Sequence, residues 1–292
     1  GCTRKCSFCA IPGIRGKARS RPVTDILSEA RQLAASGIRE LNLVAQDTSA
    51  YGQDLGDGTS LVQLLTALET VPHIAWIRLL YLYPTSIDTA LLKTMRDMAK
   101  VVPYFDIPIQ HASDSMLRRM RRGHGAERLK KLIGRIRKMV PRAVLRTAVL
   151  VGHPGETADD FAELLEFVSW ARFNHLGAFR YSDEEGTHSY RSEPVVSPRD
   201  SYNRQRKVMA LQRTVSKQIN RKLKGETLEV LVEGTADRDG YVLTGRHAGQ
   251  APEIDGVTYL VSSDAKPGQI VEARVVKSDA YDLVVEPAFA IV

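Results

Sequence analysis

The chain opens with GCTRKCSFCAIPGIRG (residues 1–16), a stretch that holds Cys2, Cys6 and Cys9, the only cysteines among 292 residues. An odd number of cysteines packed into nine residues argues against a framework of disulfides, which needs pairs. Clustered thiols of this kind are typical of a metal site or a redox site. We therefore expect the protein to work in a reducing compartment, the cytoplasm.

Three kinds of site compete for the three thiols. A zinc site normally takes four ligands, so His111 or His124 would have to join the cysteines. A redox pair would use Cys6 and Cys9 and leave Cys2 without a role. A 4Fe-4S cluster takes one thiolate per iron, so three cysteines leave one iron open to bind a substrate or cofactor. We favour the cluster, because three thiols suffice when one metal position must stay free, and we keep zinc, a redox pair and surface cysteines without a role as alternatives.

Beyond the cysteines, short apolar runs alternate with amphipathic stretches. Strands are predicted at residues 40–45, 76–83, 104–110, 144–152 and 176–182. Helices are predicted at residues 23–36, 59–70, 86–99, 113–121, 126–139 and 157–172. Strands separated by helices predict a parallel sheet. We expect an α/β fold, a partial (β/α)6 barrel whose first strand would have preceded Gly1.

Toward the C-terminus the pattern of predicted secondary structure changes. Residues 199–224 predict one long helix, and from residue 225 short strands alternate with Gly, Asp and Pro turns, the pattern of a small all-β barrel. The expected domains are residues 1–198 for the α/β core, 199–224 for a linking helix and 225–292 for the barrel. No apolar run approaches the ~18 residues that span a membrane, so we expect no membrane partner.

The two parts of the chain also carry net charges of opposite sign. Residues 225–292 carry 12 Asp/Glu and 5 Lys/Arg, a net charge of −7, whereas residues 1–224 carry 22 and 36, a net charge of +14. A barrel that gripped nucleic acid is expected to be basic, because phosphate contacts dominate that affinity. An acidic barrel suits a strongly basic protein partner, although the charge can also serve solubility alone.

The spacing Cys-x3-Cys-x2-Cys, with Phe8 before the last cysteine, resembles that of the radical S-adenosylmethionine enzymes. Further stretches resemble their methylthiotransferase branch, and the end of the chain resembles the TRAM domain of that branch. These stretches are ELNLVAQDTSAYGQDL (40–55), WIRLLYLYP (76–84), DIPIQHASDSMLRRMRRG (106–123), LRTAVLVGHPGETADDF (145–161) and YSDEEGTHS (181–189).

The resemblance implies an activity and its cofactors. S-adenosylmethionine would bind the open iron of a three-cysteine 4Fe-4S cluster, take an electron from an external donor and yield a radical that removes hydrogen from the substrate. The wording AIPGIRG, VAQDTSAYG, YLYP and IQHASD resembles the subgroup that methylthiolates the β-carbon of an aspartate in the twelfth protein of the small ribosomal subunit. The alternative is methylthiolation of a tRNA adenosine, with tRNA as the partner.

The resemblance also implies a second 4Fe-4S cluster, held by three cysteines of an N-terminal domain that this sequence does not contain. We therefore expect these 292 residues to be incomplete for the full reaction and to cleave the cofactor at best.

Candidate cofactor contacts follow the ends of the predicted strands, because ligands of parallel α/β barrels collect where the strands finish. The resemblance implies that Gln46 and Asp47 lie where related enzymes contact the methionyl amino group, and Gln110 and Ser113 are candidates for the ribose or carboxylate. Glu156 begins a predicted helix and is a further candidate. We assign no residue as catalytic.

Arg146 is a sixth candidate, because it is a charge on an otherwise apolar strand and a buried charge needs a partner. The cofactor carboxylate is one such partner. The alternative is an ion pair with a neighbouring carboxylate of the protein.

Overall fold

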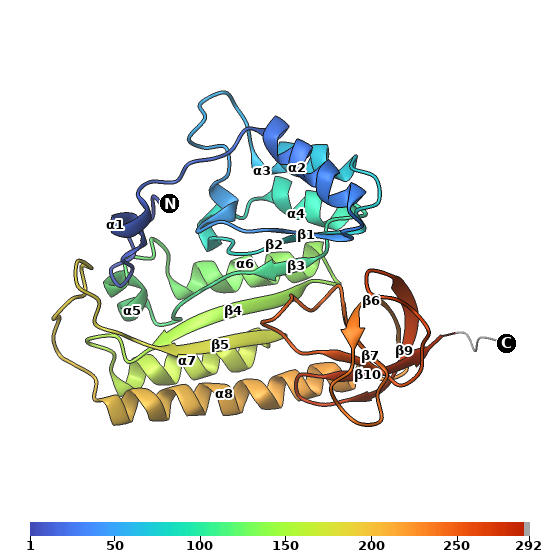
Figure 1. The fold of residues 1–292 in the computed structure, drawn as a ribbon. Helices are drawn as coiled ribbons and strands as arrows, with labels where there is room; N and C mark the ends of the chain where they lie inside the picture. The colour runs from blue at the N-terminus through green and yellow to red at the C-terminus, as the bar shows by residue number, and fades with distance from the viewer. Residues whose placement is uncertain (289–292) are drawn as a thin grey trace.

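Five parallel strands form the centre of the first part of the chain in a computed structural model that describes residues 1–288 (Figure 1). They are β1 (Glu40–Leu43), β2 (Trp76–Leu79), β3 (Tyr104–Asp106), β4 (Val144–Val151) and β5 (His175–Arg180). β1 pairs with β2, and β3, β4 and β5 pair in that order, all in parallel. The two sheets meet where the Leu82 amide donates to the Asp106 carbonyl at 2.8 Å. The predicted partial α/β barrel is confirmed.

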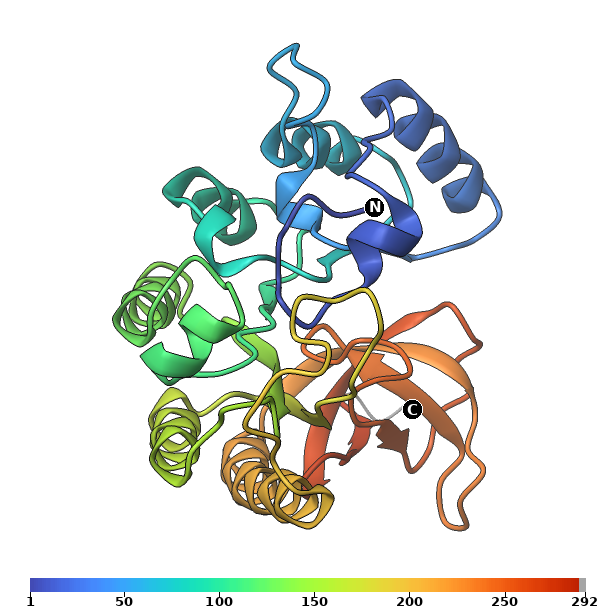
Figure 2. The ribbon, with the colours of Figure 1, turned by 90° about the vertical axis from the view of Figure 1, so that its left-hand side faces the viewer.

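Helices cover the outer face of this open barrel, as Figure 2 shows in end view. Its helices, in chain order, are α1 (Ile11–Arg15), α2 (Val23–Ala35), η1 (Thr48–Ala50), α3 (Leu61–Glu69), η2 (Pro84–Ser86), α4 (Thr89–Asp97), α5 (Asp114–Arg119), α6 (Ala126–Met139) and α7 (Ala158–Ala171). Local sequence explains several of their starts. Ser60 and Thr157 form capping boxes at α3 and α7, in which side chain and backbone exchange hydrogen bonds.

The strands alternate between two environments. Along β4 the odd-numbered residues, from Leu145 to Val151, are buried against the helices, whereas the even-numbered ones face the interior of the barrel and are partly exposed. β3 ends earlier than predicted, at Asp106. Pro108 has no amide hydrogen for the ladder, and pairing resumes only at an isolated bridge between Gln110 and Val149.

A 24-residue helix, α8 (Pro198–Arg221), runs along the core to a second, closed barrel. The strands of this C-terminal barrel are β6 (Thr227–Thr235), β7 (Leu243–His247), β8 (Thr258–Leu260), β9 (Ile270–Ser278) and β10 (Leu283–Pro287), in the spatial order β10-β8-β7-β6-β9. The predicted small all-β barrel is confirmed. No helix in the described part of the chain is long and apolar enough to cross a membrane.

The C-terminal barrel packs against the ends at which the core strands begin. Trp76 and Tyr104, the first residues of β2 and β3, share an apolar cluster with Leu231 and Ala251 of the barrel. Glu40, the first residue of β1, lies between two buried guanidinium groups, with Arg78 at 2.8 Å and Arg246 at 2.7 Å. The barrel therefore closes one end of the open core and leaves the other end free.

Candidate functional site

The three cysteines lie in a loop at the free end, where the core strands finish (Figures 1 and 2). The loop is tied to segments that follow three different strands. Arg4 pairs with Asp47 after β1, the Ser7 amide donates to the Met120 carbonyl after β3, and the Ser7 hydroxyl lies 3.4 Å from His153 after β4. The thiols therefore occupy the position at which parallel α/β barrels bind their ligands.

The thiols are free and partly exposed. Within residues 1–288, no three His, Cys, Asp or Glu side chains converge as closely as one metal ion requires. Thiolates that each bind a different iron of one cluster do not have to converge in that way. The donor set of Cys2, Cys6 and Cys9 therefore fits a three-cysteine cluster.

Burial raises the pKa of the Cys9 thiol, the neighbouring Cys6 and Cys2 add to that rise, and Arg122 partly opposes it. A thiol with a raised pKa remains protonated at neutral pH unless a cation replaces the proton. Metal binding supplies that cation and deprotonates a coordinating thiol.

Asp47, a predicted cofactor contact, holds the cysteine loop in this structure. Its carboxylate accepts from Arg4 Nε at 2.7 Å and from the Ser49 hydroxyl at 2.5 Å. Arg4 also donates to Ser86 Oγ at 2.6 Å and lies over the ring of Tyr83. The adjacent Gln46 is exposed, and it lies beside the loop with its side chain open to a ligand.

Gln110 and Ser113, both predicted to contact the cofactor, lie in different environments. Gln110 has a positive φ of 68°, its backbone pairs with Ala148 and Leu150, and its side chain is partly exposed at the strand end. Ser113 is buried, and its hydroxyl donates to the carboxylate of Asp160. The structure therefore leaves Gln110 available to a ligand and uses Ser113 in an internal hydrogen bond.

Glu156 is buried and fully engaged. Its carboxylate accepts from the Gly152 amide, pairs with Arg204 at 2.9 Å and lies 3.3 Å from His111 Nε2. His111 Nδ1 accepts from the Ser113 amide, so its Nε2 carries the proton and donates to Glu156. The geometry gives no support to a cofactor contact by Glu156.

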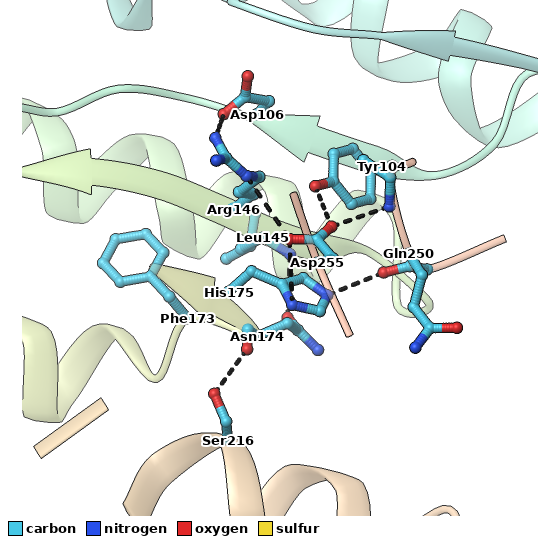
Figure 3. Close-up of polar contacts among 12 residues, drawn as sticks. Tyr104, Asp106, Leu145, Arg146, Phe173, Asn174, His175, Ser216, Gln250 and Asp255 are labelled. Atoms are coloured by element: carbon cyan, nitrogen blue, oxygen red, sulfur yellow. Dashed lines mark hydrogen bonds and ion pairs between the residues drawn. The ribbon is translucent and has the colours of Figure 1, made fainter. Parts of the chain in front are cut away.

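Arg146 lies toward the opposite end of the core from the cysteines. It is the third residue of β4, and its guanidinium pairs with Asp106 at 2.9 Å and faces Asp255 of the C-terminal barrel at 3.6 Å (Figure 3). Tyr104 also donates to Asp255, at 2.5 Å. The geometry therefore favours the ion-pair alternative over the cofactor role predicted for Arg146, because two carboxylates of the protein face this charge.

Two residues that line the site were not predicted. His153 is buried, and burial lowers its pKa and keeps its ring neutral. Its Nδ1 donates to the Pro154 carbonyl at 2.9 Å, so Nε2 accepts from the Ser189 hydroxyl at 2.9 Å. Arg122 donates to Cys6 Sγ at 3.1 Å. His153 stands in the quoted motif VGHPGE, whereas no spacing rule connects Arg122 to a cysteine 116 residues away.

Two family models match the chain. Residues 1–168 match that of the radical SAM superfamily, and residues 225–287 match that of the TRAM domain. Similar curated proteins include the ribosomal protein uS12 methylthiotransferase RimO of Sorangium cellulosum, 50% identical over 98% of this chain and 60% of that protein. The RimO of Aquifex aeolicus is 45% identical over 97% of this chain and 66% of that protein. The chain thus spans about 60% of such relatives.

Solved structures resemble the fold at low sequence identity. Coproporphyrinogen III oxidase of Escherichia coli, a radical SAM enzyme, has a TM-score of 0.55 at 13% identity, covering 95% of this chain and 65% of its own. SuiB of Streptococcus suis bound to S-adenosylmethionine has a TM-score of 0.51 at 15% identity, covering 71% of this chain and 44% of its own. At these identities the likeness concerns the fold alone.

Proposed function

The chain belongs to the radical SAM superfamily, and we propose that it is the part of a methylthiotransferase that directs radical chemistry to the β-carbon of an aspartate in ribosomal protein uS12. The observation that carries this proposal is the loop of three free thiols where the core strands finish. Identity of 50% to a RimO protein over almost the whole chain supports the choice of substrate.

Cys2, Cys6 and Cys9 would hold a 4Fe-4S cluster, which when bound supplies an open iron for S-adenosylmethionine and the electron that cleaves it. The chain's own residues position that site. Arg4 and Asp47 fix the cysteine loop to the end of β1, and we propose that the exposed Gln46 accepts from the methionyl amino group. Gln110 offers a second polar side chain for the ribose or carboxylate.

The acidic C-terminal barrel is the surface that we propose for the basic ribosomal protein. It lies against the starting ends of the strands, away from the thiols. The eight residues of β4 alone span roughly 25 Å at about 3.3 Å per residue. The partner would therefore bind the C-terminal barrel at one end of the molecule and be modified near the thiols at the other end. The same net charge of −7 disfavours tRNA as the ligand of this barrel.

Further parts of the proposal concern the whole enzyme. They are a second 4Fe-4S cluster on a separate N-terminal domain, an external electron donor and action in the cytoplasm. The division of the chain into residues 1–198, 199–224 and 225–292 belongs to the same proposal.

The first test is anaerobic reconstitution with iron and sulfide, followed by reduction and EPR spectroscopy with and without S-adenosylmethionine. We expect a 4Fe-4S signal that changes when the cofactor is added, together with release of 5′-deoxyadenosine. A signal that ignores the cofactor, or binding of zinc in place of iron, would overturn the radical-enzyme assignment.

The second test separates the two partners. We expect the chain to bind purified ribosomal protein uS12 and to bind tRNA only weakly, with loss of the protein complex as salt is raised. A matched variant in which Glu226 and Glu229 are replaced by Lys should weaken the protein complex. Preferential, salt-sensitive binding of tRNA would contradict the choice of substrate.

A further inference from the structure

Arg122 brings a buried positive charge to one of the cluster ligands. It follows α5, is only 4% exposed, and donates to Cys6 Sγ at 3.1 Å and to the Pro108 carbonyl at 2.6 Å. Its guanidinium lies over the ring of Tyr83 at 4.5 Å, and the Tyr83 hydroxyl returns a hydrogen bond to the Arg122 carbonyl. These contacts fix both the backbone and the head of the side chain.

The charge of Arg122 has no carboxylate to balance it. Within the described residues 1–288, no Asp or Glu oxygen forms an ion pair with it, and its Nε finds no hydrogen-bond acceptor. Arg4, which stacks on the same Tyr83, differs because it is paired with Asp47. Burying a cation without an anion costs folding free energy. A negative charge near Cys6 would therefore stabilise Arg122.

We infer that Arg122 is a positioning residue that stabilises the reduced state of the cluster bound by Cys2, Cys6 and Cys9, an inference that rests on the proposed function. A cluster held by three thiolates is anionic, and one electron from an external low-potential reductant adds one more negative charge without breaking a bond. Hydrogen bonds to the ligand sulfurs and nearby positive charge are the means by which a protein sets the reduction potential. Arg122 supplies both.

An arginine is required for this geometry. One amino group of its planar fork reaches Pro108, another reaches the sulfur, and the face of the guanidinium rests on Tyr83. A lysine keeps the charge but has no fork and no flat face, and a methionine loses charge and donors together. The two substitutions therefore separate the contribution of charge from that of the directed hydrogen bond.

The test is an EPR-monitored redox titration of the reconstituted chain, comparing wild type with Arg122→Met, Arg122→Lys and the exposed control Arg118→Met. We expect Arg122→Met to reduce the equilibrium constant for cluster reduction by at least about tenfold, which lowers the midpoint potential of a one-electron couple by about 59 mV. Arg122→Lys should lower it less, and Arg118→Met should leave it unchanged.

The outcomes distinguish the inference from the proposed function. A loaded Arg122→Met protein with the wild-type potential overturns the role of Arg122. If that variant fails to fold or to load, Arg122→Gln decides, because it removes the charge and keeps an amide donor, and a wild-type potential in it overturns the inference equally. A wild-type chain that binds no 4Fe-4S cluster overturns the proposed function, and the inference with it.

Discussion

The same five strands end in two contrasting environments. Where they finish, the structure presents free thiols and the exposed side chain of Gln46, and no carboxylate among residues 1–288 pairs with the buried Arg122. Where they begin, Arg78 is completely buried and paired with Glu40, which also pairs with Arg246 of the C-terminal barrel. The buried arginines at the second end are paired with carboxylates, although Nη2 of Arg78 has no hydrogen-bond partner within the described residues, whereas the first end presents side chains that a ligand can reach.

The difference teaches how to judge a charged residue in the interior of the protein. Arg146 and Arg122 are both buried or nearly so, but Arg146 lies between Asp106 and Asp255 and needs nothing more (Figure 3). In the part of the chain that the structure describes, the guanidinium of Arg122 has only a sulfur and a carbonyl as acceptors. The state of the partners, and not burial alone, distinguishes a structural charge from one that serves a ligand. The four predictions that follow test this contrast.

The largest effect is expected at the cysteine end. Cys2→Ala removes one ligand of the predicted cluster, and we expect iron and sulfide binding to be lost together with all cofactor cleavage. The fold should persist, because the cysteine loop lies outside the apolar core, and the thermal unfolding midpoint of the iron-free protein should match wild type. Iron analysis and calorimetry provide the measurements.

The matched control for that change is Ser7→Ala, which alters the same loop without removing a thiol. It should still bind iron. A Cys2→Ala protein that retains the full iron content would show that this cysteine is not a ligand.

At the opposite end, Glu40→Gln should change stability and leave the cluster intact. The substitution leaves Arg78 and Arg246 buried without their shared anion, a loss of about 3–5 kcal/mol in the free energy of unfolding. Denaturant titration measures it. The same chemical change at Glu29, whose pair with Arg21 is exposed, should have no measurable effect. Equal effects at the two positions would refute the contrast between the two ends.

The junction with the barrel should also be sensitive to acid. Burial, the neighbouring His175 and the charges of Arg78 and Arg246 lower the pKa of His247 to about 3. The unfolded chain therefore binds a proton that the folded chain does not, so stability is full above a pH of about 6.5 and falls as the pH drops below it.

Denaturant titrations between pH 7 and pH 4 test that expectation. In His247→Gln the free energy of unfolding should fall less steeply as the pH drops, by a difference in slope that corresponds to about one bound proton. Parallel curves for wild type and variant would show that His247 does not hold this role.

The smallest effect concerns Ser113, which lies near the cysteine end but is committed to Asp160. Ser113→Ala should cost about 1 kcal/mol of stability through the lost hydrogen bond. The affinity for S-adenosylmethionine, measured by calorimetry on the reconstituted chain, should not change. A manyfold weaker affinity for S-adenosylmethionine would show that Ser113 does contact the cofactor. Gln110→Ala, which alters a partly exposed side chain at the same strand end, is the comparison expected to weaken binding.

Features encoded by neighbouring residues could be predicted from the sequence. The helix expected at 126–139 is α6 to the residue, because its apolar positions repeat with helical spacing and Gly125 precedes it. The three cysteines are adjacent along the chain and needed no fold to be grouped. β3 ends at Asp106, short of the predicted residue 110, because Pro108 has no amide hydrogen for the ladder.

Contacts that depend on how distant elements pack could not be predicted. Arg122 stands in the run Arg118-Arg-Met-Arg-Arg, just past the end of α5, where helical periodicity no longer tells which arginine turns inward. Arg146 was correctly seen as a charge that needs a partner, but one of its partners, Asp255, belongs to the C-terminal barrel. No local pattern connects those two elements.

The ion pair between Glu40 and Arg246 has a consequence for biosynthesis. The two residues are 206 positions apart in the chain. At about 5–20 residues per second, a ribosome makes Glu40 roughly 10–40 s before its partner. During that interval the first strand carries a carboxylate that the finished protein buries, so the beginning of the core can take its final form only after most of the chain has been translated.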